Sequence, residues 1–267
     1  MCRLLGVVAA EPAGLADLLE AEIHPFTSLA AVHCDGWGLS YWDDHDDLVT
    51  TKAPGTALSS QRYRQAIDGA GTDAAILHLR KASPDMANVV ANTHPFGAGK
   101  VAFAHNGYFC PLGPVERLVE ESGPRAYGGD TDSERYFALV LAEMRIHPPA
   151  EALHRAATQI AAMTDAVALN ALMLTQDALH AIAFSDSYGV STPDRDAAAW
   201  VLKYRVEDEK VIVASSGWDQ NAPHWQTLAN RSVLTVSRRD LRVSTHRSPA
   251  PLRSHDRRTT WQCTPMP

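Results

Sequence analysis

Hydrophobic and polar residues alternate along several segments of the chain, the pattern of strands with one buried face. The first of these segments covers residues 2–9, where Cys2, Leu4, Gly6 and Val8 would share one face. Two short apolar runs flank the acidic turn DDHDD, which indicates a hairpin. In all, the pattern predicts strands over residues 2–9, 37–42, 48–52, 74–81, 100–105, 167–174, 178–184, 198–206, 210–214 and 232–236.

Elsewhere apolar residues recur every three to four positions, which predicts amphipathic helices. The strongest helix begins at Thr131, because Thr131 and Glu134 have the spacing of a capping box and an apolar stripe follows them. Helices are predicted over residues 15–22, 59–69, 113–121, 131–145 and 150–163.

The order of these elements is strands, then helices, then strands again. This order predicts an α+β fold in which two antiparallel sheets face each other with helices outside. We expect a single domain over residues 2–246, followed by a tail rich in Pro and Arg over residues 247–267.

Composition excludes several classes of protein. The 267 residues carry a formal net charge of −7, which does not favour general nucleic-acid binding. We find no apolar run long enough to span a bilayer, and the N-terminus does not resemble a secretory signal, so we expect a cytoplasmic protein without a membrane partner. Seven arginines gather between Ser237 and Arg258, which indicates either a solvated basic tail or a tail that binds phosphate or a partner.

The chain has four cysteines, and their spacing fits neither a C-x-x-C pair nor a zinc site. Because the N-terminus is typical of a cytosolic protein, structural disulfides are not expected. Cys2 differs from the others by its position. Removal of Met1 would give Cys2 both a thiol and a free α-amine, whose reference pKa values are roughly 8.5 and roughly 8. The amine can then accept the thiol proton, as an N-terminal nucleophile requires.

Two segments carry candidate groups for binding a ligand. Arg80 and Ser83 lie at and just beyond the end of a predicted strand, where the planar guanidinium suits a carboxylate or simply a surface ion pair. His94 precedes a proline in the segment NTHPF, which favours an extended backbone. A histidine here is either structural or part of a site.

Two further segments each have a structural and a functional interpretation. Asn106 and Gly107 follow a predicted strand, and they form either a hairpin turn or an oxyanion hole made by a side-chain amide and a backbone N–H. Asp132 lies in the first turn of the strongest predicted helix, where an acid stabilises the helix or binds an ammonium group.

Together these groups suit one ligand. Arg80 fits an α-carboxylate, Asp132 an α-ammonium, and Asn106 with Gly107 a tetrahedral oxyanion formed when Cys2 attacks an amide carbonyl. The combination predicts a binding site for glutamine or a γ-glutamyl amide.

The sequence resembles the class II glutamine amidotransferases, which are N-terminal-nucleophile hydrolases, and is most similar to stand-alone members. MCRLLG, DGWG, H-x-R-x-A-S, NTHPF, AHNG and GDTDSE occur in the order found in that family. The resemblance implies a four-layer αββα sandwich, without metal or cofactor. It also implies Cys2 as the nucleophile, Asn106 and Gly107 at the oxyanion hole, and a glutamine pocket with Arg80, Ser83, His94 and Asp132.

Three functions remain open from the sequence. The chain is expected to hydrolyse glutamine or a γ-glutamyl amide through a γ-glutamyl thioester, and it either acts alone or delivers ammonia to a separate synthetase. A catalytically inactive scaffold subunit is the third possibility. The segment Ser215–Ser216–Gly217–Trp218 differs from the Ala-Ser-Glu-Pro-like segment expected there, so the leaving group is not identified.

Overall fold

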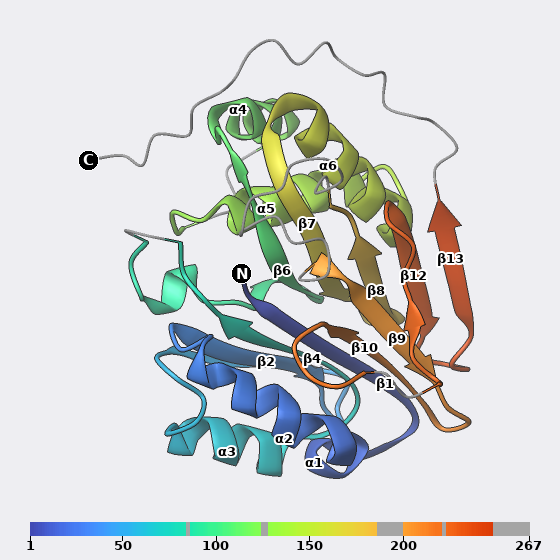
Figure 1. The fold of residues 1–267 in the computed structure, drawn as a ribbon. Coiled ribbons are helices and arrows are strands. Elements are labelled where there is room, and N and C mark those ends of the chain that lie inside the picture. The colour runs from blue at the N-terminus through green and yellow to red at the C-terminus, as the bar shows by residue number, and fades with distance from the viewer. Residues whose placement is uncertain (84–85, 124–127, 186–199, 221–222, 248–267) are drawn as a thin grey trace.

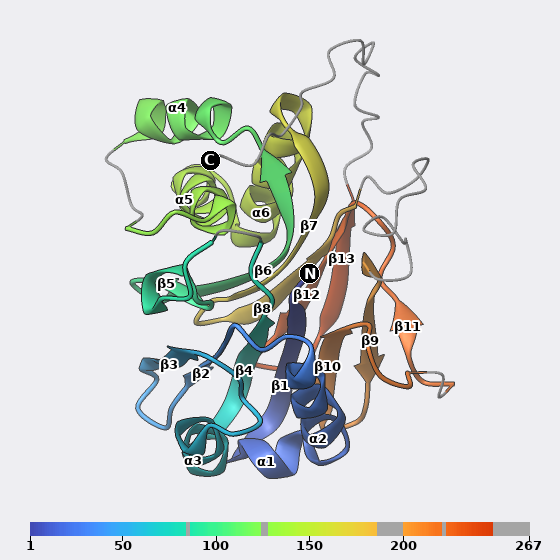
Figure 2. The same ribbon diagram turned by 60° about the vertical axis from the view of Figure 1, so that its left-hand side comes forward.

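A computed structural model describes residues 1–83, 86–123, 128–185, 200–220 and 223–247. Two antiparallel sheets lie face to face, and helices cover the outer face of each, so the described chain forms four layers (Figures 1 and 2). This arrangement confirms the predicted α+β class and the αββα sandwich.

The first sheet has seven strands and contains the N-terminal strand near its centre. Its order is β11 (Gln226–Thr227), β9 (Leu202–Val206), β10 (Lys210–Ser215), β1 (Arg3–Gly14), β4 (Gly71–Arg80), β2 (Gly36–Trp42) and β3 (Leu48–Pro54). The helices on its outer face are α1 (Leu15–Leu18), α2 (Glu20–Ser28) and α3 (Gln61–Gly69), and a 3-10 turn, η1 (Leu29–Ala31), follows α2.

The second sheet has six strands. Its order is β13 (Val243–Arg247), β12 (Ser232–Ser237), β8 (Ala178–Ala183), β7 (Asp165–Leu174), β6 (Val101–Cys110) and β5 (Phe96–Ala98). Its outer face carries α4 (Gly113–Ser122), α5 (Asp132–Met144) and α6 (Pro149–Met163), and the 3-10 turn η2 (Val90–Asn92) precedes β5.

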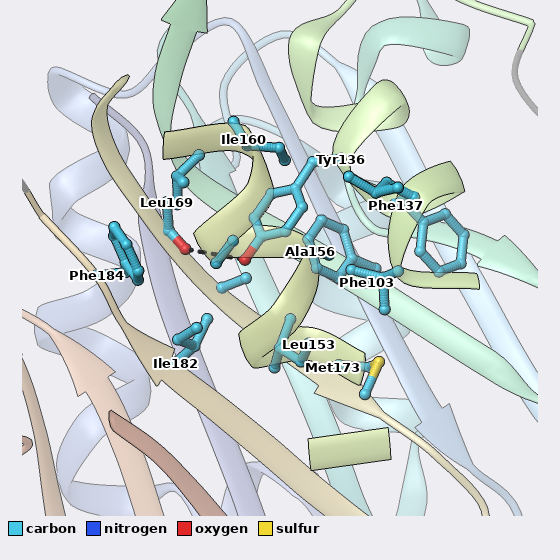
Figure 3. Close-up of a cluster of buried hydrophobic side chains, with 14 of the residues drawn as sticks. Phe103, Tyr136, Phe137, Leu153, Ala156, Ile160, Leu169, Met173, Ile182 and Phe184 are labelled. Atoms are coloured by element: carbon cyan, nitrogen blue, oxygen red, sulfur yellow. Dashed lines mark hydrogen bonds between the residues drawn. The ribbon is translucent and has the colours of Figure 1, made fainter. Parts of the chain in front are cut away.

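Three apolar layers hold the sandwich together, because each sheet buries both of its faces. Side chains such as Leu4 and Val8 pack between the two sheets, whereas Leu5 and Val7 pack against the helices below β1. The layer between the second sheet and its helices contains a cluster of aromatic and aliphatic side chains (Figure 3). In that cluster the Tyr136 hydroxyl donates to the Leu169 carbonyl oxygen at 3.3 Å, so the buried phenol has a partner.

Most predicted elements are present. The hairpin and the helix capped by Thr131 are both confirmed, and Thr131 Oγ1 accepts the Glu134 N–H at 3.2 Å. The patterns did not reveal three short strands, β5, β11 and β13. All three are short edge strands, where only a few residues can show alternation.

Two expectations about the C-terminal part are corrected. Arg247 was assigned to the tail, but it is the last residue of β13, which pairs with β12. The rest of the predicted tail lies outside the described residues. Residues 198–199 of a predicted strand also lie outside them. Arg238 is the first arginine of the predicted basic segment, yet it is mostly buried and bonds to Asp73 and Asp46. The charge count along the sequence did not reveal these acidic partners, which come from distant strands and turns.

The expectation that no structural disulfide exists is wrong for Cys110, which is disulfide-bonded, whereas Cys2 and Cys34 are free. The expectation followed from the character of the N-terminus, which carries no information about which cysteines meet in the fold. In the described part of the chain no helix is both long and apolar enough to cross a membrane.

Candidate active site

Cys2 lies immediately before β1, and the N-terminal end of the chain lies where the two sheets face each other (Figures 1 and 2). Side chains alternate along a strand, so Cys2 shares the inward face with Leu4 and Gly6. A Cβ added to Gly6 would lie 3.0 Å from Leu179 of the opposite sheet, which confirms the predicted face. The backbone N–H of Cys2 donates to Asn106 Oδ1 at 2.8 Å, and this bond joins β1 to β6 across the sandwich.

The Cys2 thiol is partly buried, and its Sγ lies 3.7 Å from the Lys81 carbonyl oxygen, just beyond the end of β4. Burial raises the pKa of the Cys2 thiol above its ordinary value. The positive N-terminus, the Lys81 hydrogen bond and the Arg80 charge lower this pKa, and the Asp132 charge raises it. Arg80 and Asp132 are therefore both near enough to act electrostatically on the sulfur.

Asn106 is fully buried within β6, opposite Asn170 of β7. The predicted turn interpretation of Asn106 and Gly107 is wrong, because β6 continues through both residues to Cys110. While Asn106 Oδ1 accepts the Cys2 N–H, its Nδ2 is buried and has no hydrogen-bond partner in the described part of the chain. A buried amide donor without a partner is costly, which makes it a candidate for binding a ligand atom.

Gly107 lies where the two strands approach closely. A Cβ there would be 1.8 Å from the Ala168 carbonyl oxygen, so only glycine fits. Leu169 of β7 lies opposite Gly107, and its N–H donates to the Phe184 carbonyl oxygen on the side away from β6. Gly107 and Leu169 therefore form a pair of the antiparallel ladder that exchanges no backbone hydrogen bonds. The Gly107 N–H therefore points away from β7, towards the edge where β5 pairs only with residues 101–103.

Arg80 ends β4 and is almost completely buried. Its Nη1 donates to Asn88 Oδ1 at 2.6 Å and its Nη2 to the Ala87 carbonyl oxygen at 3.4 Å. Asp35 supports the same loop, because its carboxylate accepts the Ala82 N–H at 2.8 Å. Burial lowers the pKa of Arg80, but a guanidinium stays charged, and the fork retains further donors for a ligand.

Asp132 is the first residue of α5. Its Oδ2 accepts the Phe109 N–H at 3.1 Å, and its Oδ1 accepts the Ser133 N–H at 2.8 Å. These bonds fix the carboxylate beside the end of β6. The helix-capping and ammonium-binding interpretations are thus compatible, because Thr131 caps the helix through its own hydroxyl.

Asn92 connects the Arg80 loop with the segment that leads into α5. It is fully buried; its Nδ2 donates to the Ala87 carbonyl oxygen at 3.2 Å, and its Oδ1 accepts the Asp130 N–H at 3.0 Å. The same Ala87 oxygen accepts from Arg80. Of the motif NTHPF only the histidine was predicted to belong to the site, because the bonds of Asn92 depend on the approach of loops, which the residue pattern does not reveal.

The structure locates the two remaining predicted pocket residues differently. The His94 ring is buried and stacks on His78, with ring centroids 4.2 Å apart, and meets the edge of Phe96 at 4.4 Å. Burial holds the pKa of His94 well below its ordinary value, so the ring is neutral. Ser83 is exposed, and its carbonyl oxygen accepts the Met86 N–H at 3.2 Å. None of these contacts is with Cys2, and the two pocket assignments stay predictions.

No group of three or more His, Cys, Asp or Glu side chains among the described residues is arranged to hold a metal ion. The arrangement at β1, β4, β6 and α5 combines a sulfur, a free amide donor, a cation and an anion. It has the chemistry to attack a carbonyl carbon and to hold the two charged groups of an amino acid.

Two facing antiparallel sheets with helices on both outer sides are the fold of the N-terminal-nucleophile hydrolases. The chain belongs to the class II glutamine amidotransferases, because the model of that family matches residues 1–259. Members of this family are enzymes, and they hydrolyse the amide of glutamine with an N-terminal cysteine. A search of curated proteins finds no match to the chain.

Solved structures share the fold at low sequence identity. A glutamine aminotransferase class-II domain protein from Silicibacter pomeroyi superposes with a TM-score of 0.63 at 19% identity, covering 92% of this chain and 99% of that one. Glutamine phosphoribosylpyrophosphate amidotransferase from B. subtilis gives 0.63 at 17%, covering 92% of this chain. A structure described as the allosteric regulatory enzyme of purine biosynthesis gives 0.68 at 17%, with 92% covered. This chain spans 49% of each of the last two.

Proposed function

We propose that the chain hydrolyses the γ-amide of glutamine or of a γ-glutamyl amide, with Cys2 as the nucleophile. The observation that carries this proposal is the position of Asn106. One end of its amide accepts from the Cys2 backbone nitrogen at 2.8 Å, and the other is a buried donor without a partner. The Asn106 side chain thus holds the residue of the proposed nucleophile with its oxygen and offers a free donor with its nitrogen. Acyl transfer requires such a donor close to the nucleophile.

The proposed reaction begins after removal of Met1, which converts the Cys2 nitrogen from a peptide amide into an α-amine. The amine takes the thiol proton, and the thiolate attacks the γ-carbonyl carbon. Asn106 Nδ2 and the Gly107 N–H donate to the oxygen as it becomes negative. The amine returns the proton to the leaving nitrogen, and water then hydrolyses the γ-glutamyl thioester to release glutamate.

The proposed orientation of the substrate follows from charge. Arg80 binds the α-carboxylate and Asp132 the α-ammonium, because each carries the charge opposite to that group, and the two residues come from separate elements, β4 and α5. Binding the carboxylate requires the Arg80 fork to share or exchange its bonds with Asn88 and Ala87. Ser83 and His94 stay in this proposal as residues that line the glutamine pocket, and neither is assigned a step of the reaction.

The test is release of glutamate from glutamine and from a panel of γ-glutamyl amides. Cys2→Ala in the processed chain is expected to abolish release, whereas Cys34→Ala, which removes the exposed free thiol, is expected to retain it. Full activity of Cys2→Ala on every compound would overturn the nucleophile assignment. The compound with the highest kcat/KM identifies the leaving group.

The second candidate function is delivery of ammonia to a separate synthetase. It is supported by the family match over residues 1–259, because an amidotransferase passes the nitrogen that it releases to an acceptor. Under this function, glutamine is the best substrate in the panel and hydrolysis accelerates when the partner is present. A strong preference for a substituted γ-glutamyl amide over glutamine would exclude it.

A further inference from the structure

His105 is a second buried histidine beside the site, on β6 immediately before Asn106. Its Nε2 lies 3.2 Å from the Ala168 carbonyl oxygen, and its Nδ1 lies 2.9 Å from Ser133 Oγ. A carbonyl oxygen only accepts hydrogen bonds, so Nε2 carries the proton of the neutral ring. Nδ1 is then an acceptor.

The Ser133 hydroxyl has two acceptors within reach but only one proton. One acceptor is His105 Nδ1 at 2.9 Å, and the other is Asp132 Oδ1 at 3.2 Å. If the hydroxyl donates to Asp132, it occupies a lone pair of the carboxylate that is proposed to bind the α-ammonium. If it donates to His105, Asp132 Oδ1 keeps that lone pair and accepts only the Ser133 backbone N–H at 2.8 Å.

We propose that His105 is a positioning residue, whose Nδ1 accepts the hydrogen bond of the Ser133 hydroxyl and thereby keeps Asp132 open to the substrate α-ammonium. This inference rests on the proposed function, because it assumes that Asp132 binds the ammonium. Its effect reaches the substrate through two side chains, so it concerns binding of the amino group and not the attack on the amide. No contact of His105 with Cys2 is required.

The test compares KM and kcat for two substrates in the processed full-length chain. The first substrate is glutamine, and the second is 4-carbamoylbutanoate, which has the same amide and carboxylate but no α-amine. His105→Leu removes the acceptor and is expected to raise KM for glutamine on the order of tenfold, the size of one charge-assisted hydrogen bond. It leaves kcat for glutamine and KM for 4-carbamoylbutanoate within about twofold.

Two further variants isolate the hydroxyl proton. His105→Asn keeps an acceptor near the place of Nδ1 and is expected to restore KM for glutamine. His105→Gln places its amide near Nε2 and is expected to leave KM for glutamine raised. This pair replaces His105→Leu if the leucine variant does not fold.

On a Ser133→Ala background no hydroxyl competes for the acceptors, so His105→Leu is expected to cause no further rise in KM for glutamine. A matched control is His180→Leu, which removes an equally buried histidine on β8.

Failure of this inference differs from failure of the proposed function. An equal rise in KM for both substrates, or the same rise on the Ser133→Ala background, would overturn the role of His105. Asp132→Asn tests the underlying assignment in the same assay. If that variant leaves KM for glutamine unchanged, the ammonium site itself is misassigned, and the role of His105 falls with it.

Discussion

At the scale of single residues, Asn106 uses the two ends of its side-chain amide in different ways. The oxygen fixes the Cys2 nitrogen at 2.8 Å, and the nitrogen remains a buried donor. No other residue type fits at the neighbouring Gly107, because any Cβ there would clash with the Ala168 carbonyl oxygen. Two donors are thus held rigidly by β6 and are not supplied by a mobile loop, so little reorganisation is needed when charge develops.

Asn106→Asp separates these two uses. The aspartate keeps an acceptor for the Cys2 nitrogen but replaces the free donor with a second oxygen. We expect kcat to fall by about 10²–10³, the loss typical of one oxyanion-hole donor, with a small change in KM. Steady-state release of glutamate measures both constants. A kcat within about fivefold of the parent would show that Nδ2 does not stabilise the oxyanion.

Arg80→Lys tests the carboxylate clamp. Lysine keeps the charge but loses the planar fork, so we expect KM for glutamine to rise about tenfold with a smaller change in kcat. Arg64→Lys on α3 is the matched control, since Arg64 is exposed and its Nη1 donates to the Leu58 carbonyl oxygen. An unchanged KM in Arg80→Lys would count against the clamp.

Residue types and their spacing revealed part of this site. Cys2, Arg80, Asn106, Gly107 and Asp132 were predicted, and the structure brings their elements together. The supporting residues were not found, because the bonds of Asn92 and Asp35 depend on how loops approach each other, and those of His105 depend on how β6 packs beside β7 and α5. His94 was selected for its chemistry, but its neutral ring stacks on His78.

At the scale of elements, the two sheets are tied together at the end of β4 opposite to Arg80. Arg238, just after β12, donates to Asp73 of β4 at 2.7 Å and to the Gln176 carbonyl oxygen at 2.6 Å. Its guanidinium also lies over the Trp42 ring, 5.2 Å from the ring centroid. This cluster holds the register of the two sheets far from the site.

Arg238→Ala is expected to lower the free energy of unfolding by about 3 kcal/mol, because it leaves the mostly buried Asp73 carboxylate without its partner. Asp46→Asn is the control; that side chain is 48% exposed, so its loss should cost less than about 1 kcal/mol. Urea unfolding measures both values. Equal effects of the two substitutions would contradict the assigned difference in burial.

Alternation and periodicity predicted the long strands and helices well, since each has one face in an apolar layer. They misjudged the end of β6, where an Asn-Gly pair continues a strand because β7 lies beside it. Intrinsic turn preference is local and weak, and pairing with a neighbouring strand overrides it.

At the scale of the whole molecule, several histidines are buried without a charge partner. Burial lowers the pKa of His33 to about 4, of His78 to about 3 and of His180 to about 4. Between each lowered pKa and the unfolded value of roughly 6.5, only the unfolded chain binds the proton. Stability is therefore complete above pH 6.5 and falls as the pH decreases towards 4.

His180→Leu isolates one of these contributions away from the site. For a folded pKa of about 4, the parent loses about 2 kcal/mol between pH 7 and pH 5 through His180 alone, and the variant should lack that part of the pH dependence. Denaturant unfolding at both pH values measures the difference. Identical pH dependence in parent and variant would show that His180 is not held neutral by burial.

The central claim is that Cys2, freed of Met1, is the nucleophile of a glutamine-binding site. Its most direct test is intact-mass and peptide analysis after reaction with a glutamine analogue that carries a diazoketone in place of the amide. The account predicts one adduct per chain, on the thiol of an N-terminal Cys2, that free glutamine suppresses. An adduct on Cys34, or active protein that retains Met1, would contradict it.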